Sequence, residues 1–452
     1  MMSTVNVDEI HLKGGFEGVY DRLSSMDYSF FLDSSMGESN LGRYSFIGFN
    51  PSLVFRSKGM RVELIDRNGR VIVKHGDPFD LLNRLIKKRC VENPMKIPFP
   101  GGAVGYFAYD LGVFSIKNFR FKSKDDLNNW DCVLGFYNSI LARDNLKKKD
   151  FLIACNGRER DLMLEMLAMV KPAKGKKPEI GALKSNFSKQ PYCSAVRKVK
   201  DYIAAGDIYQ ANLSQRFNAG FRGDSWLLYK RLRALNPAPF AAYLNFPEVK
   251  VLCDSPERFL RIDGRLIETR PMKGTRPRGG SKAEDRKLKN ELLNSPKDKA
   301  ENLMIVDLER NDLGRVCEFG SVKVSELEVV ETYPTVFQMV SNVQGILRKG
   351  VGQVDCLKAC FPGGSITGAP KVRAMEIIDE LEPTRRNIYT GAVGYLGFDG
   401  SMDLNIAIRT IIVKDNRVYF QVGGGIVADS NPEDEYMETL VKAKALLRAL
   451  GK

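Results

Sequence analysis

Residues 268–280 read Glu-Thr-Arg-Pro-Met-Lys-Gly-Thr-Arg-Pro-Arg-Gly-Gly. The first two of them are the end of a β-like segment, Arg265–Thr269. Two prolines disfavour a helix here, because proline lacks an N–H group and fixes φ. Pro271 and Gly274 bracket Lys273 and fix the direction of its stem, and three arginines lie near it in sequence. Crowded cations disfavour one another, so we expect a lowered pKa that lets Lys273 act as a nucleophile. Taken alone, the stretch fits a solvated basic loop better.

The composition is that of a globular protein with a sizeable core: 452 residues, 43% hydrophobic and 27% charged. The N-terminus lacks the basic start and apolar run of a signal peptide, and no apolar run is long enough to span a bilayer. Eight scattered cysteines with no Cys-x-x-Cys pair are typical of reduced thiols. We therefore expect a cytoplasmic protein without membrane contact.

The formal charge of +14 raises the possibility of a nucleic-acid partner. The lysines are spread along the chain, however, and no nucleic-acid-binding module or interleaved stacking aromatics accompany them. A positive balance also fits small anionic substrates, which it attracts by electrostatic steering. We therefore expect no nucleic-acid partner, and a basic binding protein remains the non-enzymatic alternative.

Turn signals and periodicity divide the chain into two parts. Residues 1–170 are β-rich, with a hairpin over Arg61–Val73 around Asn68-Gly69. Residues 171–189 are polar and without periodicity, which predicts a linker. Residues 190–452 carry the motifs with chemical potential, and helices are expected over Lys297–Asp312 and Pro370–Leu381.

The C-terminal end is predicted to be a β-meander followed by one helix. Strands are expected over Ala392–Phe398, Leu404–Val413 and Arg417–Val422. The helix follows a capping Ser or Asn after Asp429, and its other face is expected to be apolar, including Met437 and Val441.

The last helix also places charged groups beside a glycine run. Glu435, Glu438 and Lys442 have the spacing i, i+3 and i+7 and share one face. Just before the helix, Gly423-Gly-Gly425 predicts a turn whose N–H groups can hold a carboxylate or phosphate. An ordinary surface ion pair between Glu438 and Lys442 is the simpler alternative.

Glu301 borders the apolar run Leu303–Leu308, where a carboxylate is costly unless it is paired or binds a metal. Two glutamates from separate helices, completed by water and a substrate oxygen, are a ligand set that Mg²⁺ prefers. Glu301 with Glu435 or Glu438 is therefore a candidate Mg²⁺ site.

Gly363-Gly-Ser-Ile-Thr-Gly-Ala-Pro-Lys371 predicts a turn into a helix, where Ser365, Thr367, Lys371 and free amides form either an anion site or a helix cap. The only histidines are His11 and His75, which makes a histidine triad or an ordinary zinc site improbable. No cysteine stands in a glutaminase-type Gly-x-Cys-x-Gly motif.

Together these stretches resemble the chorismate-utilising enzymes, and most closely the aminodeoxychorismate synthases among them. The resemblance is dense over residues 190–448 and looser at residues 42–48 and 101–110. It is carried by residues 206–215, 255–259, 269–275, 300–308, 310–315, 362–371, 391–395 and 423–438.

The resemblance implies an α+β fold, a large antiparallel β-sandwich with helices packed outside. It also implies a covalent mechanism in which Lys273 adds to chorismate and Glu257 is the general acid. Ammonia then displaces Lys273 to give 4-amino-4-deoxychorismate. Mg²⁺ is expected at Glu301, Glu435 and Glu438. The implied substrate-binding residues are Gln210, Thr275, Ser365, Tyr389, Arg409, Gly423, Gly424, Gly425 and Lys442.

Two positions separate the reactions within the family. Isochorismate and salicylate synthases both have a lysine at the position of Gln210 in this chain. A glutamine side chain cannot act as a general base, which disfavours their reactions here. Anthranilate synthases have alanine where this chain has Lys273. Many relatives also have histidine where this chain has Gln338, which cannot shuttle a proton.

The same resemblance implies a partner. Because the chain lacks a glutaminase motif, ammonia is expected from a separate glutamine amidotransferase subunit, in a heterodimer, or from free ammonium. Anthranilate synthase component I is the enzymatic alternative. The first part of relatives can bind tryptophan, near the position of Phe31–Ser35.

Overall fold

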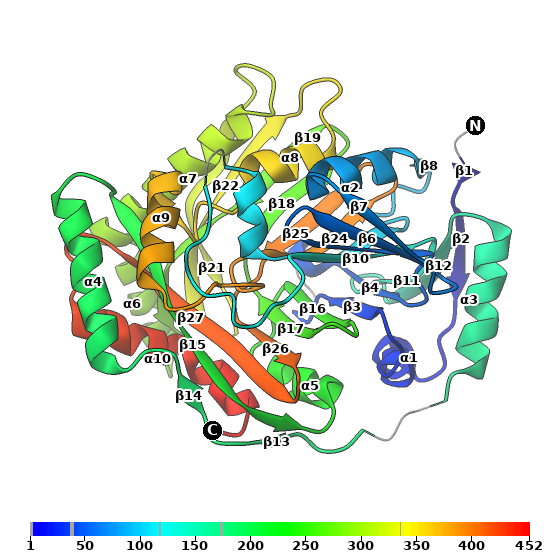
Figure 1. Ribbon diagram of the computed structural model, residues 1–452, viewed down its shortest axis with the longest axis horizontal. Coiled ribbons are helices and arrows are strands. Elements are labelled where there is room, and N and C mark those ends of the chain that lie inside the picture. The colour runs from blue at the N-terminus through cyan, green and yellow to red at the C-terminus, as the bar shows by residue number, and fades with distance from the viewer. Residues whose placement is uncertain (1–2, 37–39, 117–118, 172–174, 335) are drawn as a thin grey trace.

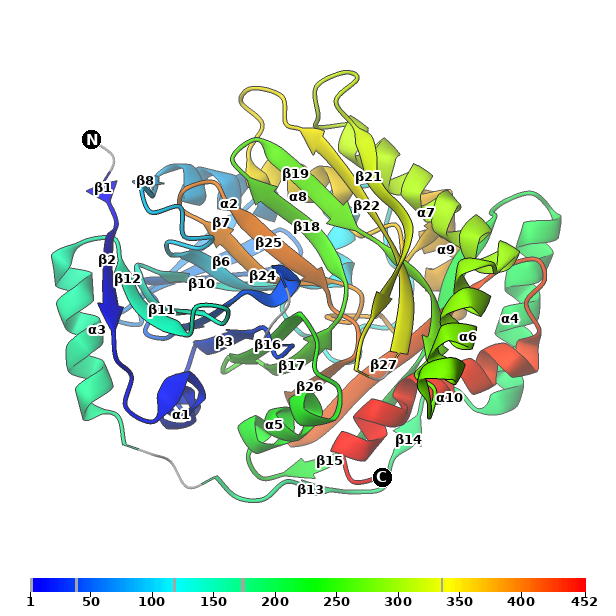
Figure 2. The same cartoon turned by 180° about the vertical axis from the view of Figure 1, so that it is seen from behind.

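The computed structural model describes residues 3–36, 40–116, 119–171, 175–334 and 336–452. Two large antiparallel sheets form its centre and helices cover them on the outside (Figures 1 and 2). The predicted α+β sandwich is confirmed. No helix in these ranges is long and apolar enough to cross a membrane.

The first sheet has twelve strands. In spatial order they are β20 (Met272–Pro277), β22 (Val336–Ile346), β19 (Leu266–Arg270), β18 (Arg258–Asp263), β25 (Met402–Ile406), β24 (Ala392–Gly397), β9 (Gly102–Phe107), β10 (Cys132–Tyr137), β5 (Leu53–Lys58), β6 (Arg61–Asp66) and β7 (Val71–His75), with β21 (Lys323–Thr332) beside β22.

The second sheet has thirteen strands. In spatial order they are β13 (Glu179–Ile180), β15 (Gln210–Arg222), β27 (Arg417–Ile426), β26 (Thr410–Lys414), β17 (Lys250–Ser255), β16 (Phe240–Asn245), β3 (Ser29–Asp33), β4 (Tyr44–Gly48), β11 (Ser139–Asp144), β12 (Lys149–Ala154) and β2 (Asn6–Ile10), with β14 (Lys184–Ser185) and β23 (Gly368–Ala369) beside β15. A short parallel pair joins β1 (Ser3–Thr4) to β8 (Val91–Glu92).

The helices pack around these sheets. They are α1 (Gly15–Leu23), α2 (Pro78–Lys87), α3 (Gly157–Met169), α4 (Lys189–Ala204), α5 (Ser225–Leu235), α6 (Lys282–Leu293), α7 (Pro296–Gly314), α8 (Gln353–Cys360), α9 (Lys371–Leu381) and α10 (Pro432–Ala449), with 3-10 turns η1 (Asn40–Gly42) and η2 (Tyr109–Phe114). Helices α4 and α10 contact each other at the end of the molecule away from α3 (Figures 1 and 2).

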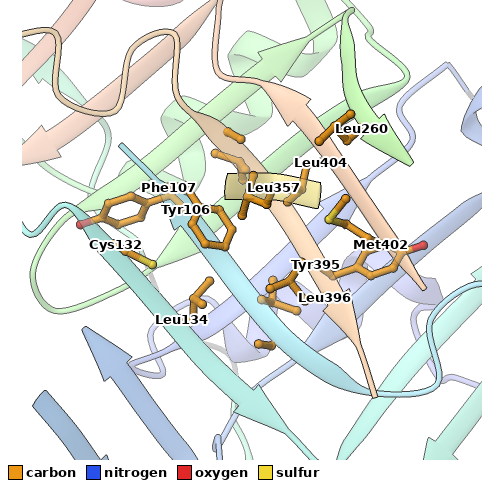
Figure 3. Packing of buried hydrophobic residues seen from close by; sticks show 14 of the residues in the cluster. Tyr106, Phe107, Cys132, Leu134, Leu260, Leu357, Tyr395, Leu396, Met402 and Leu404 are labelled. Carbon is orange, nitrogen blue, oxygen red and sulfur yellow. The ribbon is translucent and has the colours of Figure 1, made fainter. Parts of the chain in front are cut away.

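Both large sheets contain strands from before and after the predicted linker. Strand β9 pairs with β24 in the first sheet, and β3 pairs with β16 in the second. The main core contains side chains of both sheets and of helices that cover them, and Figure 3 shows part of it, with side chains of β9, β10, β24 and β25 and Leu357 of α8. Within the predicted linker, β13 and β14 add short strands to β15, and residues 172–174 lie outside the described residues.

The predicted strand Leu404–Val413 is wrong as one element. It divides into β25 in the first sheet and β26 in the second, so the chain changes sheets between them. Arg409 lies at this crossing with φ of 50°, in the left-handed region that side chains other than glycine rarely adopt. Such a conformation costs on the order of 1–3 kcal/mol and is concentrated at functional sites.

The predicted turn at Gly423–Gly425 is also wrong, because these glycines belong to β27 and pair with β15. Three side chains of the predicted apolar run and apolar helix face are instead about half exposed, namely Leu303, Met437 and Val441. The buried residues of α10, which packs against β27, are Glu435, Thr439, Ala443, Leu446 and Ala449. Periodicity located the helices and indicated their core side only in part, because Ile305 and Val306 of α7 and Met375 and Ile378 of α9 are buried.

Candidate active site

Lys273 projects from β20, a short strand that pairs with β22. The ladder has an irregularity between Lys273 and Thr275, where Gly274 has φ of 73°. A β-carbon on Gly274 would stand 2.8 Å from Leu292 of α6 and 2.9 Å from Asp298 of α7. Both the backbone conformation and the lack of space therefore require glycine at position 274. This glycine sets the direction of the chain immediately after Lys273.

Strand β27 forms the opposite wall of the site. A β-carbon on Gly425 would stand 1.8 Å from Nε2 of Gln210 and 3.4 Å from Nζ of Lys273. A β-carbon on Gly424 would stand 3.2 Å from Oε2 of Glu435 and 3.6 Å from Oε1 of Glu438. Any side chain here would displace these groups, so the glycines leave room for a ligand between them.

The glycine segment is also open along one edge. Strand β15 pairs with β27 as far as Ile426, whereas β26 pairs with it only up to Phe420. Beyond Phe420 one edge of β27 therefore has no strand partner among the residues that the structure describes. Backbone N–H groups on such an edge can bind carboxylates, which keeps the anion-binding role predicted for the glycines although they form a strand.

The pKa of Lys273 is lowered, chiefly by burial, while the Glu301 carboxylate opposes this effect and the Lys442 ammonium adds to it. The neighbouring arginines are not the cause. Arg270 pairs with Glu326 and Glu331, Arg276 with Asp298, and Arg278 with Asp285. The lowered pKa follows from the enclosed position of the ammonium rather than from a crowded basic loop.

Glu257 is buried at the start of β18 and accepts a hydrogen bond of 2.6 Å from the Ser365 hydroxyl. Burial raises its pKa to about 7, against the opposing effects of Ser365 and the Lys273 ammonium. A carboxyl group with this pKa holds a proton near neutral pH and can give it to a leaving group.

Arg409 supplies positive charge to the same site. Burial lowers its pKa, and Asp254, Tyr333 and Glu257 oppose that effect. Its guanidinium has no ion pair or side-chain hydrogen bond with any residue that the structure describes. A desolvated, unpaired guanidinium is well suited to bind a carboxylate of a substrate.

Tyr389 and Gln210, two of the predicted substrate-binding residues, are both buried. The guanidinium carbon of Arg386 lies 5.8 Å from the ring centre of Tyr389, and burial raises the pKa of Tyr389. Gln210 is buried at the start of β15, and its Oε1 has no hydrogen-bond partner in the described chain. An unsatisfied buried amide oxygen costs free energy unless a ligand or water completes it.

The three acidic side chains predicted for Mg²⁺ are electrostatic neighbours. The pKa of Glu301 is raised by burial and further by Glu438, and that of Glu435 is raised by burial and by Glu438. The pKa of Glu438 is lowered by Lys442, with which it forms an ion pair of 2.7 Å. No set of three Asp, Glu, His or Cys side chains in the described ranges is already gathered as a metal site. Mg²⁺ is commonly held by one or two carboxylates with substrate oxygens and water, and this donor set fits that pattern.

Other predicted residues take varied positions. Lys442 also donates a 3.0 Å hydrogen bond to the Gly423 carbonyl, whereas Thr275 is exposed on β20 opposite Gln338. At the predicted anion site before α9, Lys371 is buried and paired with Asp312, and Thr367 donates to the carbonyls of Gly363 and Gly364. That turn is held mainly by internal bonds, and Ser365 is the member bonded to Glu257.

Sequence reasoning missed Lys297 and Asp254. Lys297 lies one helical turn before Glu301; its positive charge opposes the rise in the pKa of Glu301 and of Glu435, and adds to the effect of Lys442 in lowering the pKa of Glu438. Its i, i+4 spacing from Glu301 was a usable signal. Asp254 is buried in β17 and its pKa is raised to about 7 by burial. Nothing in the sequence placed it beside Arg409, because the two meet only through strand pairing.

A cavity of about 790 Å³ lies elsewhere, between the two sheets, and is lined by Leu32, Asp33 and Ser34 among others. It coincides with the position where relatives are expected to bind tryptophan. Its arginines are paired: Arg258 with Glu268 and Asp403, and Arg270 with Glu326 and Glu331. These two arginines of the polar cavity are therefore compensated by neighbouring carboxylates.

Comparison with known proteins gives concordant matches. The family model for chorismate binding enzymes matches residues 29–448. The chain is 41% identical to anthranilate synthase component 1 of Aquifex aeolicus, covering 94% of this chain and 89% of that protein. It is 40% identical to aminodeoxychorismate synthase component 1 of Bacillus subtilis, covering 97% and 95%. The structure of anthranilate synthase component I from Streptococcus pneumoniae superposes with a TM-score of 0.79 at 33% identity, covering 90% and 92%.

Proposed function

The chain belongs to the chorismate binding enzyme family, and on that basis we propose that it converts chorismate and ammonia to 4-amino-4-deoxychorismate. The product would serve the synthesis of 4-aminobenzoate and folate. The observation that carries the proposal is Lys273, a lysine of lowered pKa that faces Gln210 across Gly425. A lowered pKa raises the fraction of the neutral amine, which is the nucleophilic form of lysine.

The reaction divides into two displacements. In the first, the neutral amine of Lys273 adds at C2 of chorismate, the ring double bonds shift, and the C4 hydroxyl leaves as water with the proton of Glu257. In the second, ammonia adds at C4, the double bonds shift back, and Lys273 leaves as a neutral amine. The Glu257 carboxylate then takes a proton from the new C4 ammonium group, which returns the enzyme to its starting state.

Positive groups and amides hold the substrate in this scheme. The unpaired guanidinium of Arg409 and the open edge of Gly423–Gly425 would bind its carboxylates, and Tyr389 and Ser365 would orient it. Glu301, Glu435 and Glu438 would hold Mg²⁺, which supplies charge neutralisation for a substrate carboxylate. Lys442 would hold Glu438 in place when the metal is absent.

The ammonia donor is part of the proposal. The chain contains no glutaminase motif, and the relatives named above are called component 1. We therefore propose a heterodimer with a glutamine amidotransferase subunit in the cytoplasm, with free ammonium as a substitute in vitro.

Anthranilate synthase is the second candidate, because relatives of that name are as similar as the aminodeoxychorismate synthases. That reaction also eliminates pyruvate and makes the ring aromatic, which requires proton removal from the ring. Gln338 stands where many relatives have histidine and offers no such base. Its amide can donate and accept hydrogen bonds but cannot take up a proton, and its buried Oε1 has no partner in the described chain.

Product analysis distinguishes the two candidates. Purified protein would be incubated with chorismate, Mg²⁺ and excess ammonium salt, and the products separated by chromatography. We expect a product that added aminodeoxychorismate lyase converts to 4-aminobenzoate. Fluorescent anthranilate together with free pyruvate would refute the proposal and assign the chain to the alternative.

A further inference from the structure

Arg386 is a buried arginine beneath the candidate active site, between α9 and β24, and only 3% of its surface is exposed. It forms an ion pair with Glu382: Nε donates to Oε2 at 3.0 Å and Nη2 donates to Oε1 at 2.8 Å. An isolated buried guanidinium would be very unfavourable, and this bidentate pair compensates its charge.

The remaining donors of Arg386 contact three separate segments. Nη1 donates to the Ile366 carbonyl at 2.8 Å and to the Thr390 hydroxyl at 3.4 Å, and Nη2 also donates to the Asn212 carbonyl. These acceptors are neighbours of predicted substrate contacts: Ile366 follows Ser365, Thr390 follows Tyr389, and Asn212 is two residues beyond Gln210.

Aromatic contacts reinforce the same arrangement. The guanidinium carbon lies 5.8 Å from the ring centre of Tyr389 and 4.9 Å from that of Tyr109 in η2. Glu382 in turn accepts hydrogen bonds from the backbone N–H and the hydroxyl of Ser214 in β15. One ion pair thus connects β15, the turn before α9 and the segment before β24.

We propose that Arg386 is a positioning residue that sets the relative placement of Gln210, Ser365 and Tyr389 around the substrate. The inference rests on the proposed function only in that these three residues contact chorismate. The planar fork of arginine can reach three acceptors in different directions at once, whereas the compact ammonium of lysine cannot reproduce that geometry.

The test uses two variants, Arg386→Lys and the double variant Arg386→Met/Glu382→Gln, which removes both charges while keeping an acceptor for Ser214. The single variant Arg386→Met serves as the reference for stability. The assay follows chorismate consumption with Mg²⁺ and ammonium, so it does not depend on which product forms. A displacement of about 1 Å in an active site costs about 100-fold in rate, and we expect kcat/KM of both variants to fall on that scale. Each variant's thermal midpoint is measured alongside.

A matched control is Arg56→Met, which breaks a partly buried pair with Glu63 and Glu248 away from the site. It should lower the thermal midpoint and leave kcat/KM unchanged. The inference is supported if the double variant melts closer to the wild type than Arg386→Met does, yet remains impaired in kcat/KM. It is overturned if the double variant recovers both properties, or if Arg386→Lys has wild-type kinetics. An anthranilate product would overturn the proposed function and leave this comparison intact.

Discussion

The candidate active site and the cavity of about 790 Å³ both contain charged side chains, but these differ in whether they form ion pairs. In the cavity, Arg258 and Arg270 each pair with two carboxylates. In the active site, Lys273, Arg409 and Glu301 have no ion pair with any residue that the structure describes. The pKa of each is shifted by burial.

The contrast shows that volume alone does not locate chemistry. A charged group that forms an ion pair within the protein is already compensated and is poorly available to a ligand. An enclosed charged group without an ion pair remains available to bind a ligand or to react. The cavity is suited to holding a molecule whose own charges balance, and the active site is suited to binding an anion and transforming it. Substitutions in the two regions should therefore have different consequences.

The largest expected effect belongs to Lys273→Ala. Loss of the nucleophile should reduce chorismate consumption by roughly 10³-fold or more, on the scale seen when a covalent catalyst is removed. Arg278→Ala serves as the control, since that exposed arginine is paired with Asp285 and should have little effect. Retention of full activity by Lys273→Ala would exclude the covalent role.

Glu257→Gln should follow, with kcat reduced by about 10²–10⁴-fold because a general acid is lost. The pH dependence gives a sharper test. Glu257 is active when protonated, so kcat/KM at constant free ammonia should decrease as pH rises through about 7. Lys273 is active when neutral, so activity should also fall toward acid, which gives a bell-shaped profile. An alkaline limb that persists at the same pH in Glu257→Gln would assign it to another group.

Glu438→Gln probes the metal. We expect the Mg²⁺ concentration for half-maximal activity to rise by at least about 10–100-fold, because removing a ligand should weaken the site no less than removing a residue that supports one. Direct Mg²⁺ binding in the presence of chorismate, measured by calorimetry, should weaken in parallel. Glu433→Gln is the control, because that exposed residue of the same helix pairs with Lys189. An unchanged Mg²⁺ requirement would remove Glu438 from the ligand set.

The smallest effect on catalysis is expected in the cavity. Asp33→Asn removes the more buried of the two carboxylates that pair with Arg233, and leaves Glu17 in place. Stability should fall by less than the roughly 3 kcal/mol that a broken buried pair costs, because Glu17 still compensates the guanidinium. Denaturant unfolding measures this loss, and kcat/KM without added effector should stay within about 3-fold of wild type. A loss of activity in Asp33→Asn as large as that of Glu257→Gln would contradict the proposed difference between the two regions.

Local sequence signals predicted much of the fold but not its three-dimensional pairing. The Asn68-Gly69 hairpin and the helices at Lys297 and Pro370 are present because turn chemistry and periodicity act within a few residues. The change of sheets at Arg409 was missed, since it depends on the partners of β25 and β26. Leu303 and Met437 were misplaced because periodicity reports an apolar stripe and not which neighbour covers it.

The residues of the candidate site were also predicted only in part, because sequence signals are local and the contacts of the site are not. The family resemblance indicated Lys273, Glu257 and Arg409, and the structure gathers them in one enclosed region. The cause of the lowered pKa of Lys273 was misjudged, because ion pairs of Arg276 and Arg278 form with residues up to 22 positions away. Arg386 could not be identified at all from local sequence, since its acceptors come from segments as far as 174 residues apart.

Covalent capture tests the central claim most directly. The protein would be mixed with chorismate and Mg²⁺ without ammonia, quenched in acid and examined by intact-mass and peptide mass spectrometry. We predict an adduct with the mass of chorismate less one water, located on Lys273 and absent from Lys273→Ala. Rapid consumption of chorismate in the presence of ammonium, with no adduct at Lys273 under any quench condition, would contradict the account.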